Sequence, residues 1–257
     1  MFRPRIIPTL LLKNKGLIKT TQFNKKKAKY IGDPINAVKI FNDLMADELV
    51  FLDVLASKNK KVIDFDLVKG IGDEAFMPFG VGGGISCLDH VDQILNNGAE
   101  KVILNTEAYL NPSLIEKIAS KYGSQSVSVC IDVKKNIFSN ENIMIVGGSK
   151  KVKLKIADYI KIIESSGAGE IIIQSIDKDG MMDGYDIGLI KKVSNQTTLP
   201  VVALGGASNV LDFEKAYTDG GASALSAGSM FVFHGPRKAV LINYPDKEKI
   251  KKNIKWI

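Results

Sequence analysis

Asp132 is the residue of this sequence best suited to acid–base chemistry. It lies near the end of the apolar run 129–133. A carboxylate at the C-terminal end of a barrel strand opens into the pocket and suits general acid or base work. A second acid, Asp179, follows the run 170–175 in a turn with Gly180. Both acids have structural alternatives, Asp132 as a loop cap and Asp179 as a turn former.

Two glycine-rich turns each follow an apolar run, about half the chain apart. Glycine lets the backbone approach an anion closely and present its N–H groups. We therefore expect two phosphate-binding turns on opposite sides of one pocket, and tight turns without a ligand are the alternative. The expected phosphate or substrate ligands are Gly83, Gly84, Asn105 and Thr106 on one side and Asp179, Gly180, Gly205, Gly206, Gly228 and Ser229 on the other, with Lys19 and Gln174 also contributing.

Four charged residues begin apolar runs where a buried core would be expected. Charge inside a barrel is costly unless it is paired. Two acids and two bases could form a closed ring across the barrel floor, either as a structural plug or as a gate. These residues are Arg5, Glu48, Lys101 and Glu170.

The elements that would position these residues alternate regularly. Eight β-branched apolar runs alternate with amphipathic stretches of helical period, which predicts a closed parallel (β/α)₈ TIM barrel formed by a single domain, residues 1–257. A doubly wound open sheet is the alternative. The expected strands are 5–12, 48–54, 77–81, 101–105, 126–133, 170–175, 200–204 and 222–227, and the expected helices are 34–45, 64–75, 87–97, 112–122, 154–165, 186–196, 209–218 and 246–253.

The two halves of the chain resemble each other. The runs beginning at residues 5, 47 and 80 have counterparts beginning at residues 128, 169 and 203, in the same order. This repetition predicts a barrel built from two duplicated half-barrels. Two connections are long: residues 13–33 could close as a lid, and residues from 136 onward are typical of a hairpin with a polar turn.

Composition narrows the class of protein. Hydrophobic residues make up 45% and charged residues 25%, as in globular proteins, and no apolar run is long enough for a membrane span. The net charge of +7 comes mostly from scattered lysines, so we expect no nucleic-acid partner. Two cysteines and two histidines lack metal-ligand spacing. We expect a cytoplasmic protein without a metal or cofactor.

Taken together, these motifs resemble the cyclase subunit of imidazole glycerol phosphate synthase. The resemblance covers nearly the whole chain. It implies a class I glutaminase partner on the N-terminal face of the barrel, ammonia passing the ring of Arg5, Glu48, Lys101 and Glu170, and a bisphosphorylated ribonucleotide at the C-terminal face. The matching runs are 5–8, 47–53, 81–85, 101–106, 123–125, 131–134, 167–171, 177–180 and 205–207.

One position departs from this family in a way that affects its chemistry. The family uses an aspartate at the end of strand 1 and another at the end of strand 5; Asp132 matches the second, but Leu11 occupies the place of the first. Gln174 and Leu204 also differ from the family pattern. The departures fit better an offshoot that works with a glutaminase and an amidotransferase-like third protein in placing acetamidino groups on bacterial surface sugars.

Three hypotheses for function remain open. The first is an enzyme subunit that transfers ammonia to a phosphate-bearing substrate, and the second is the ordinary cyclase of histidine biosynthesis. The third is a non-catalytic scaffold that activates a glutaminase. A sugar-phosphate isomerase of the same barrel type is disfavoured, because it also needs the strand-1 acid that Leu11 replaces.

Overall fold

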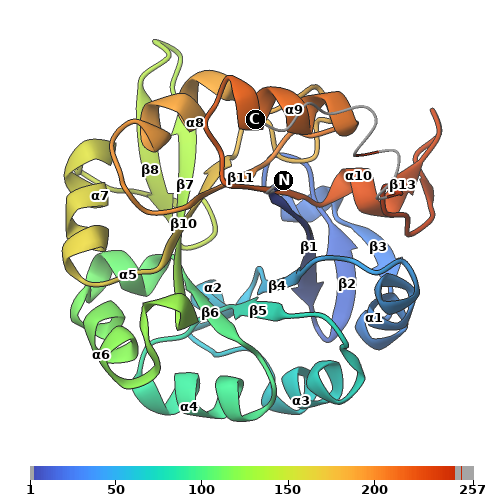
Figure 1. Cartoon of the computed structure of the whole chain (residues 1–257), viewed down its shortest axis with the longest axis horizontal. Helices are drawn as coiled ribbons and strands as arrows, with labels where there is room; N and C mark the ends of the chain where they lie inside the picture. The colour runs from blue at the N-terminus through green and yellow to red at the C-terminus, as the bar shows by residue number, and fades with distance from the viewer. Residues whose placement is uncertain (1–2, 247–249, 251–257) are drawn as a thin grey trace.

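The chain forms a closed parallel barrel in the computed structural model, which describes residues 3–246 and residue 250. In this part of the chain eight parallel strands follow one another around the ring, and pairing of β7 with β10 and of β12 with β1 closes it (Figure 1). The strands are β1 (Arg5–Lys13), β4 (Leu49–Asp53), β5 (Phe79–Gly82), β6 (Lys101–Leu104), β7 (Val127–Lys135), β10 (Glu170–Ser175), β11 (Val201–Leu204) and β12 (Ala224–Ala227).

Helices cover the outside of the barrel and start where the sequence provides caps. The Asp33, Asp64 and Asp186 carboxylates accept hydrogen bonds from backbone N–H groups in the first turns of α1, α3 and α8, and Asn209 does so for α9. Such caps satisfy otherwise unpaired donors. The longer helices are α1 (Pro34–Asp43), α3 (Phe65–Glu74), α4 (Leu88–Asn96), α6 (Ser113–Tyr122), α7 (Ile156–Ser165), α8 (Ile187–Ser194) and α9 (Val210–Thr218), and the short ones are α2 (Ala56–Asn59), α5 (Thr106–Leu110) and α10 (Ser229–Val232).

The expected (β/α)₈ barrel is confirmed, and each predicted strand agrees with an observed strand to within about two residues at either end. Seven of the predicted helices match α1, α3, α4, α6, α7, α8 and α9. The eighth, 246–253, lies outside the described residues except at its first residue and at residue 250. None of the helices in the described part of the chain combines the length and apolar character that a membrane crossing requires.

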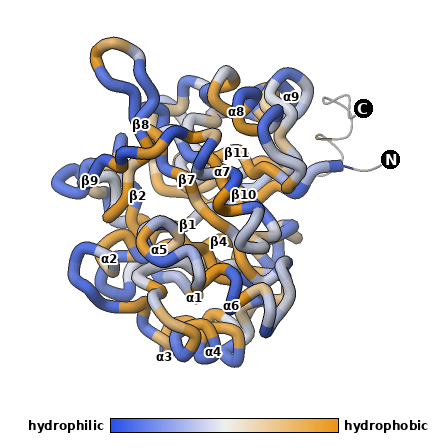
Figure 2. The backbone as a smooth tube through the Cα atoms, turned by 90° about the vertical axis from the view of Figure 1, so that its left-hand side faces the viewer, coloured by the Kyte–Doolittle hydropathy of each residue, from blue (hydrophilic) through white to orange (hydrophobic). Residues whose placement is uncertain are grey.

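The two halves of the barrel have matching extensions. β1 and β7 are the longest strands, with nine residues each, and each continues beyond the ring into an antiparallel hairpin. β1 pairs with β2 (Gly16–Lys19), which pairs with β3 (Lys29–Gly32). β7 pairs with β8 (Glu141–Ile145), which pairs with β9 (Lys150–Lys151). The predicted hairpin after residue 136 is therefore confirmed, and Figure 2 shows it projecting from the barrel. The connection 13–33 contains strands that the sequence did not predict.

Alternation along the strands divides the core into two parts. Residues such as Ile6, Leu10 and Leu12 pack outward against the helices, in the larger core cluster. A smaller cluster fills the middle of the barrel interior: Ile7, Val50, Ile103, Cys130, Ile172, Val202, Leu204 and Ala224, with Leu52 against it. Because successive side chains on a strand point to opposite sides, the charged strand starts and the polar strand ends lie on the same inner side as this cluster, one below it and one above.

Candidate functional site

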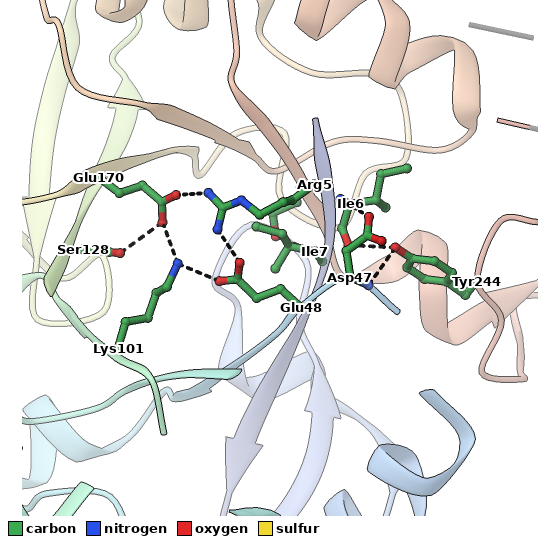
Figure 3. Close-up of polar contacts among 10 residues, drawn as sticks. Arg5, Ile6, Ile7, Asp47, Glu48, Lys101, Ser128, Glu170 and Tyr244 are labelled. Atoms are coloured by element: carbon green, nitrogen blue, oxygen red, sulfur yellow. Dashed lines mark hydrogen bonds and ion pairs between the residues drawn. The ribbon is translucent and has the colours of Figure 1, made fainter. Parts of the chain in front are cut away.

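The floor of the barrel is a closed ring of charge. Arg5 donates to the carboxylates of both Glu48 and Glu170, and Lys101 Nζ lies 3.0 Å from Glu48 Oε1 and 3.5 Å from Glu170 Oε1 (Figure 3). The acids and bases alternate, so each charge has two opposite neighbours. The structure thus brings together the four residues that the sequence proposed for this end of the barrel.

The ring contains a fifth member that the sequence prediction missed. The hydroxyl of Ser128, at the start of β7, donates to Glu170 Oε1 at 3.1 Å. Ser128 occupies the place that Arg5 holds in the first half of the chain, and its position four residues before Asp132 on the same strand would have placed it on the inner face. Burial lowers the pKa of Arg5, but the adjacent Glu170 and Glu48 carboxylates outweigh it and raise that pKa above its ordinary value.

The ring is anchored beside a second polar cluster at the same end of the barrel. Arg3 donates to both oxygens of Asp47, and the Asp47 carboxylate accepts from the Ile6 amide at 3.0 Å. The Tyr244 hydroxyl donates to the Ile6 carbonyl at 2.9 Å and accepts from the Asp47 amide at 3.2 Å (Figure 3). These bonds hold residues 3–6 in place, which fixes the direction from which Arg5 enters the ring.

Above the apolar middle of the barrel lies a cavity of about 930 Å³ at the C-terminal face. This volume is within the range of pockets that hold small molecules. Its wall contains seven of the positions singled out from the sequence: Leu11, Gly83, Gly84, Asn105, Thr106, Asp132 and Gln174. Thr20, Phe23 and Lys25, from the connection between β2 and β3, also line it.

Asp132 lies at the inner end of this cavity and is 6% exposed. Burial raises the pKa of its carboxyl to about 7, and the nearby Asp179 carboxylate adds to the rise. A group with a pKa near neutrality can both accept and donate a proton at physiological pH, as a general acid or base must. The expected position of Asp132 in the pocket is therefore observed, with an electrostatic environment that suits proton transfer.

The immediate neighbours of Asp132 include a thiol that the sequence analysis did not single out. The Cys130 Sγ donates to Asp132 Oδ1 at 3.4 Å and lies 3.9 Å from Gln174 Oε1. Gln174 on β10 is the register partner of Asp132 on β7. Burial raises the pKa of the Cys130 thiol well above its ordinary value, so this sulfur acts as a weak donor and not as a thiolate nucleophile.

Leu11 also lines the cavity and is 7% exposed. Leu11 therefore faces the same space as Asp132. In the family that the sequence resembles, an aspartate occupies this position, whereas the leucine side chain cannot exchange a proton. Of the two acids that the sequence singled out, Asp132 lines this space, and the nearby Asp179 is already paired with Lys19 at 3.0 Å.

The first of the two expected phosphate-binding turns opens into the cavity. Gly83 and Gly84 have φ values of +143° and +65°, and Asn105 Nδ2 donates to the Cys130 carbonyl at 3.0 Å. The Thr106 hydroxyl accepts from the Val146 amide at 3.0 Å, which ties it to the connection after β8.

The second set of expected ligands lies together but does not border the cavity. Gly228 lies against the side chain of Lys19, because a Cβ on this glycine would be 2.9 Å from Lys19 Nζ. Gly180 lies against the backbone of Thr20, because a Cβ there would be 2.5 Å from the Thr20 carbonyl oxygen. Two buried oxygens near Lys19 have no hydrogen-bond partner, Asp179 Oδ2 and the Ser229 hydroxyl. Gly205 and Gly206 also have positive φ, at +96° and +117°. Their role as phosphate ligands stays a prediction.

Four lysines and one histidine of the cavity wall were missed as site residues. They come from the connection before β3, from the segment after β4 and from α4, which only the tertiary structure brings together. These residues are Lys25, Lys58, Lys60, Lys61 and His90. Within the described part of the chain no group of three or more His, Cys, Asp or Glu side chains could hold a metal ion.

Comparison with known proteins gives a consistent set of relatives. Residues 5–236 match the family model described as histidine biosynthesis protein. The chain is 46% identical over 254 residues to a Leptospira borgpetersenii protein provisionally named imidazole glycerol phosphate synthase subunit HisF, with 97% of this chain and 99% of the relative covered. A Pseudomonas aeruginosa protein provisionally named as subunit hisF2 of that synthase is 42% identical over 250 residues, with the same coverage. The Alkaliphilus metalliredigens imidazole glycerol phosphate synthase subunit HisF is 38% identical over 234 residues, with 91% and 92% covered.

Proposed function

Because this chain belongs to the histidine biosynthesis protein family, we propose that it is the ammonia-accepting subunit of a synthase of the imidazole glycerol phosphate synthase type. The observation that carries this proposal is the vertical order of the barrel interior: a charged ring at the floor, an apolar middle and a cavity containing Asp132. The ring, the apolar middle and the cavity would each have a separate role along one path for ammonia through the barrel.

The apolar middle favours neutral ammonia over ammonium. Moving an unpaired cation into an apolar interior costs far more free energy than moving a small neutral molecule. The side chains of the apolar cluster are aliphatic apart from the Cys130 thiol. The Thr9 and Ser226 hydroxyls are hydrogen-bonded to each other, and the Ser226 hydroxyl also donates to the Ile7 carbonyl. Ammonia that passed the ring would therefore reach Asp132 as a free base, able to act as a nucleophile.

The floor is the surface that a glutaminase would cover. The relatives are named as subunits, which implies that they work in a complex. A class I glutaminase on the N-terminal face would deliver ammonia next to Arg5 and Glu48, and movement of one ion pair in the ring would open the path. The alternative that these ion pairs are only a structural plug predicts the same static geometry, so the test must measure nitrogen transfer.

Two reactions are candidates for this cavity, and different observations favour each. The names of the relatives refer to imidazole glycerol phosphate synthase and not to surface sugars, and they support ring closure in histidine biosynthesis better than the expected offshoot. Leu11 favours the second candidate, ammonia transfer without ring closure, as in acetamidino formation on a surface sugar with a third amidotransferase-like protein. General acid–base catalysis raises a reaction rate by about 10²- to 10⁴-fold. The loss of one of two acids should therefore remove part of that rate enhancement.

The decisive experiment supplies ammonium salt and the bisphosphorylated ribonucleotide to the purified chain and follows products by mass spectrometry. Formation of imidazole glycerol phosphate, lost in Asp132→Asn, supports the ring-closing synthase. No product here, but ¹⁵N transfer from labelled glutamine to a phosphorylated sugar in a complex with the glutaminase, supports the second candidate. No product from the isolated chain, together with unchanged product formation by the glutaminase complex in Asp132→Asn, contradicts both and supports the non-catalytic scaffold.

A further inference from the structure

We propose that Cys130 is a positioning residue for the Asp132 carboxyl: its thiol donates to Oδ1 and thereby keeps the acidic proton on Oδ2, the oxygen on the side of the cavity. This inference rests on the proposed function, because it concerns the acid of the same site. It goes beyond the presence of an acid at this place, since it states which oxygen carries the proton and which neighbouring residue decides this.

Cys130 lies at the boundary between the apolar middle of the barrel and the cavity. It belongs to the apolar cluster inside the barrel, and it also lines the cavity. The other described side chains of that cluster are aliphatic, so the thiol is the one hydrogen-bond donor among them. Because side chains two residues apart on a strand point to the same side, the thiol lies directly below the Asp132 carboxyl on β7.

The hydrogen bond between these two side chains has one direction. The Cys130 Sγ lies 3.4 Å from Asp132 Oδ1 and 3.9 Å from Gln174 Oε1. Burial raises the pKa of the thiol well above its ordinary value, and the Asp132 charge adds to the rise, so the sulfur keeps its proton at physiological pH. A carboxylate is a stronger acceptor than an amide oxygen. The thiol therefore donates to Oδ1, the nearer and stronger acceptor.

This donation makes the two oxygens of Asp132 unequal. Sulfur is a weak acceptor, so a proton on Oδ1 would lose the thiol donor and gain little in return. Oδ2 accepts no hydrogen bond from the described residues, and it is not one of the buried oxygens that lack a partner. It therefore borders the open space of the cavity that Asp132 lines. The proton of the neutral carboxyl is expected on Oδ2, where a ligand could accept it.

The arrangement keeps this proton away from arriving ammonia. Ammonia that leaves the apolar middle would pass the Cys130 thiol and then reach Oδ1 of Asp132. Ammonia is a stronger base than a carboxylate, so an acidic proton at Oδ1 would convert it to ammonium and remove its nucleophilic electron pair. With the proton on Oδ2, Asp132 can act as a general acid toward a substrate group while the nitrogen stays neutral.

The other titratable groups near Asp132 do not take the place of the thiol. Burial raises the pKa of Asp132, the hydrogen bond from Cys130 lowers it, and the Asp179 charge raises it again, but Asp179 Oδ1 is held by Lys19 at 3.0 Å. Tyr159 on α7 interacts electrostatically with Asp132, yet its hydroxyl has no hydrogen-bond partner in the described part of the chain. The remaining titratable groups of the cavity wall are Asp53, Glu107 and the four lysines and one histidine named above.

Infrared spectroscopy of the thiol tests the hydrogen bond directly. The full-length chain with Cys87→Ser keeps Cys130 as its single thiol, because the sequence contains two cysteines. The S–H stretching band should move to lower wavenumber as pH rises, with a midpoint at about 7, because the ionised Asp132 carboxylate accepts a stronger hydrogen bond than the neutral acid. In Cys87→Ser combined with Asp132→Asn the band should stay constant over the same range of pH.

Matched variants test whether the thiol controls the Asp132 proton. The free energy of unfolding falls with rising pH until Asp132 has ionised, so urea unfolding at a series of pH values reports the midpoint of this titration. Each profile is referred to the same variant with Asp132→Asn, which removes the contributions of other titratable groups. Cys130→Ala should move the midpoint upward by about 0.5 to 1 pH unit, because the hydrogen bond stabilises the ionised carboxyl.

Two further variants separate the donor from the volume of the side chain. Cys130→Ser, whose hydroxyl can donate at the same place, should return the midpoint to the wild-type value or below it. Val50→Ala removes apolar volume from the same cluster, on β4, without removing a donor. This control should leave the midpoint unchanged.

An S–H band that does not change with pH, the same change in the Asp132→Asn protein, or equal midpoints in Cys130→Ala and Cys130→Ser would overturn the inference. Both measurements use the chain without ammonia, a glutaminase or a substrate, so they do not depend on turnover. A pH-dependent band in a chain that transfers no nitrogen would contradict the proposed function alone. Nitrogen transfer by a chain whose band is independent of pH would contradict this inference alone.

Discussion

At the residue scale, the site depends on one unusual carboxyl. Asp132 is buried near a thiol and an amide, and its pKa is raised to about 7 by burial. A raised pKa is also a statement about stability, because the folded state binds a proton that the unfolded state, with an ordinary pKa near 3.9, has already released. The same environment that prepares Asp132 for proton transfer therefore destabilises the fold when the carboxyl ionises.

This gives a prediction for pH dependence. Between about pH 4 and pH 7 the folded protein holds one more proton at Asp132 than the unfolded chain, so the free energy of unfolding should fall as pH rises through this window. Asp132→Asn removes that titration, and its stability relative to wild type should rise over the same window by about 2 to 4 kcal/mol. Urea unfolding of both proteins at pH 4, 5.5, 7 and 8 measures the difference. Parallel pH profiles would show that Asp132 has an ordinary pKa.

A second prediction tests whether Leu11 limits ring closure. Leu11→Asp places a carboxyl in the same cavity as Asp132, and ammonium-driven cyclisation of the bisphosphorylated ribonucleotide should rise by about 10²-fold if a second acid is what is missing. Leu11→Asn is the matched control, with nearly the same shape and no titratable proton, and it should produce no such rise. A wild-type rate as high as that of Leu11→Asp would mean that another group already replaces the strand-1 acid.

At the element scale, the barrel strands were predictable because their signal is local. Runs such as 101–105 and 170–175 are short, β-branched and flanked by helical periods, so both their type and order follow from the sequence. The β2–β3 pair was missed, since its strands contain only four residues each and include Lys19 and Lys29. β2 pairs with β1 in a tight hairpin and β3 pairs with β2, and these pairings make them strands. Four residues are too few to show a clear alternating pattern in the sequence.

The same distinction explains which parts of the site were predictable. Asp132, Gly84 and Arg5 could be placed because a barrel puts strand ends and strand starts at known faces. The lysine group around Lys25 and Lys61 could not, because these residues belong to separate loops whose meeting depends on loop packing. Cys130 was predictable in part. Its position two residues before Asp132 on the same strand shows that its side chain points to the inner face, but only the structure shows its hydrogen bond to the Asp132 carboxylate.

The element-scale prediction concerns the turn after β5. Gly84 has a φ of +65°, and a Cβ there would collide with the Lys61 carbonyl, so Gly84→Ala should destabilise the fold by about 1 to 3 kcal/mol and weaken orthophosphate binding. Gly188→Ala is a control inside α8, where the nearest atom is 3.7 Å away. That change should stabilise the protein by about 0.5 to 1 kcal/mol through helix propensity. Equal effects of the two variants on stability would contradict the close contact at Gly84.

At the scale of the whole molecule, the barrel separates two chemical environments that the proposed reaction would link. The charged ring lies at one end and the cavity at the other, and the apolar cluster around Ile7 and Ile172 lies between them. Neither end alone indicates transfer of ammonia, since ion-pair plugs and anion pockets both occur without it. A transfer function predicts that damage to the floor affects the supply of nitrogen while the chemistry at the mouth continues.

Glu170→Gln tests this coupling directly. It removes the carboxylate shared by Arg5, Lys101 and Ser128 and leaves Glu48 as the one ring carboxylate that still pairs with the two cations. We expect the free energy of unfolding to fall by about 2 to 3 kcal/mol, less than for a fully buried pair because Arg5 is partly exposed. In the complex with the glutaminase, glutamine-driven product formation should fall at least about tenfold more than ammonium-driven formation, because the free ammonia in solution does not depend on an intact floor.

Glu141→Gln is the matched control for that variant. Glu141 pairs with Lys192 at 2.6 Å on the outer side of the barrel, where both groups are partly exposed, and its loss should cost less than about 1 kcal/mol. It lies outside the proposed path, so the ratio of glutamine-driven to ammonium-driven product formation should stay at the wild-type value. If Glu170→Gln lowers both activities equally after correction for the folded fraction, the ring stabilises the floor but does not pass ammonia.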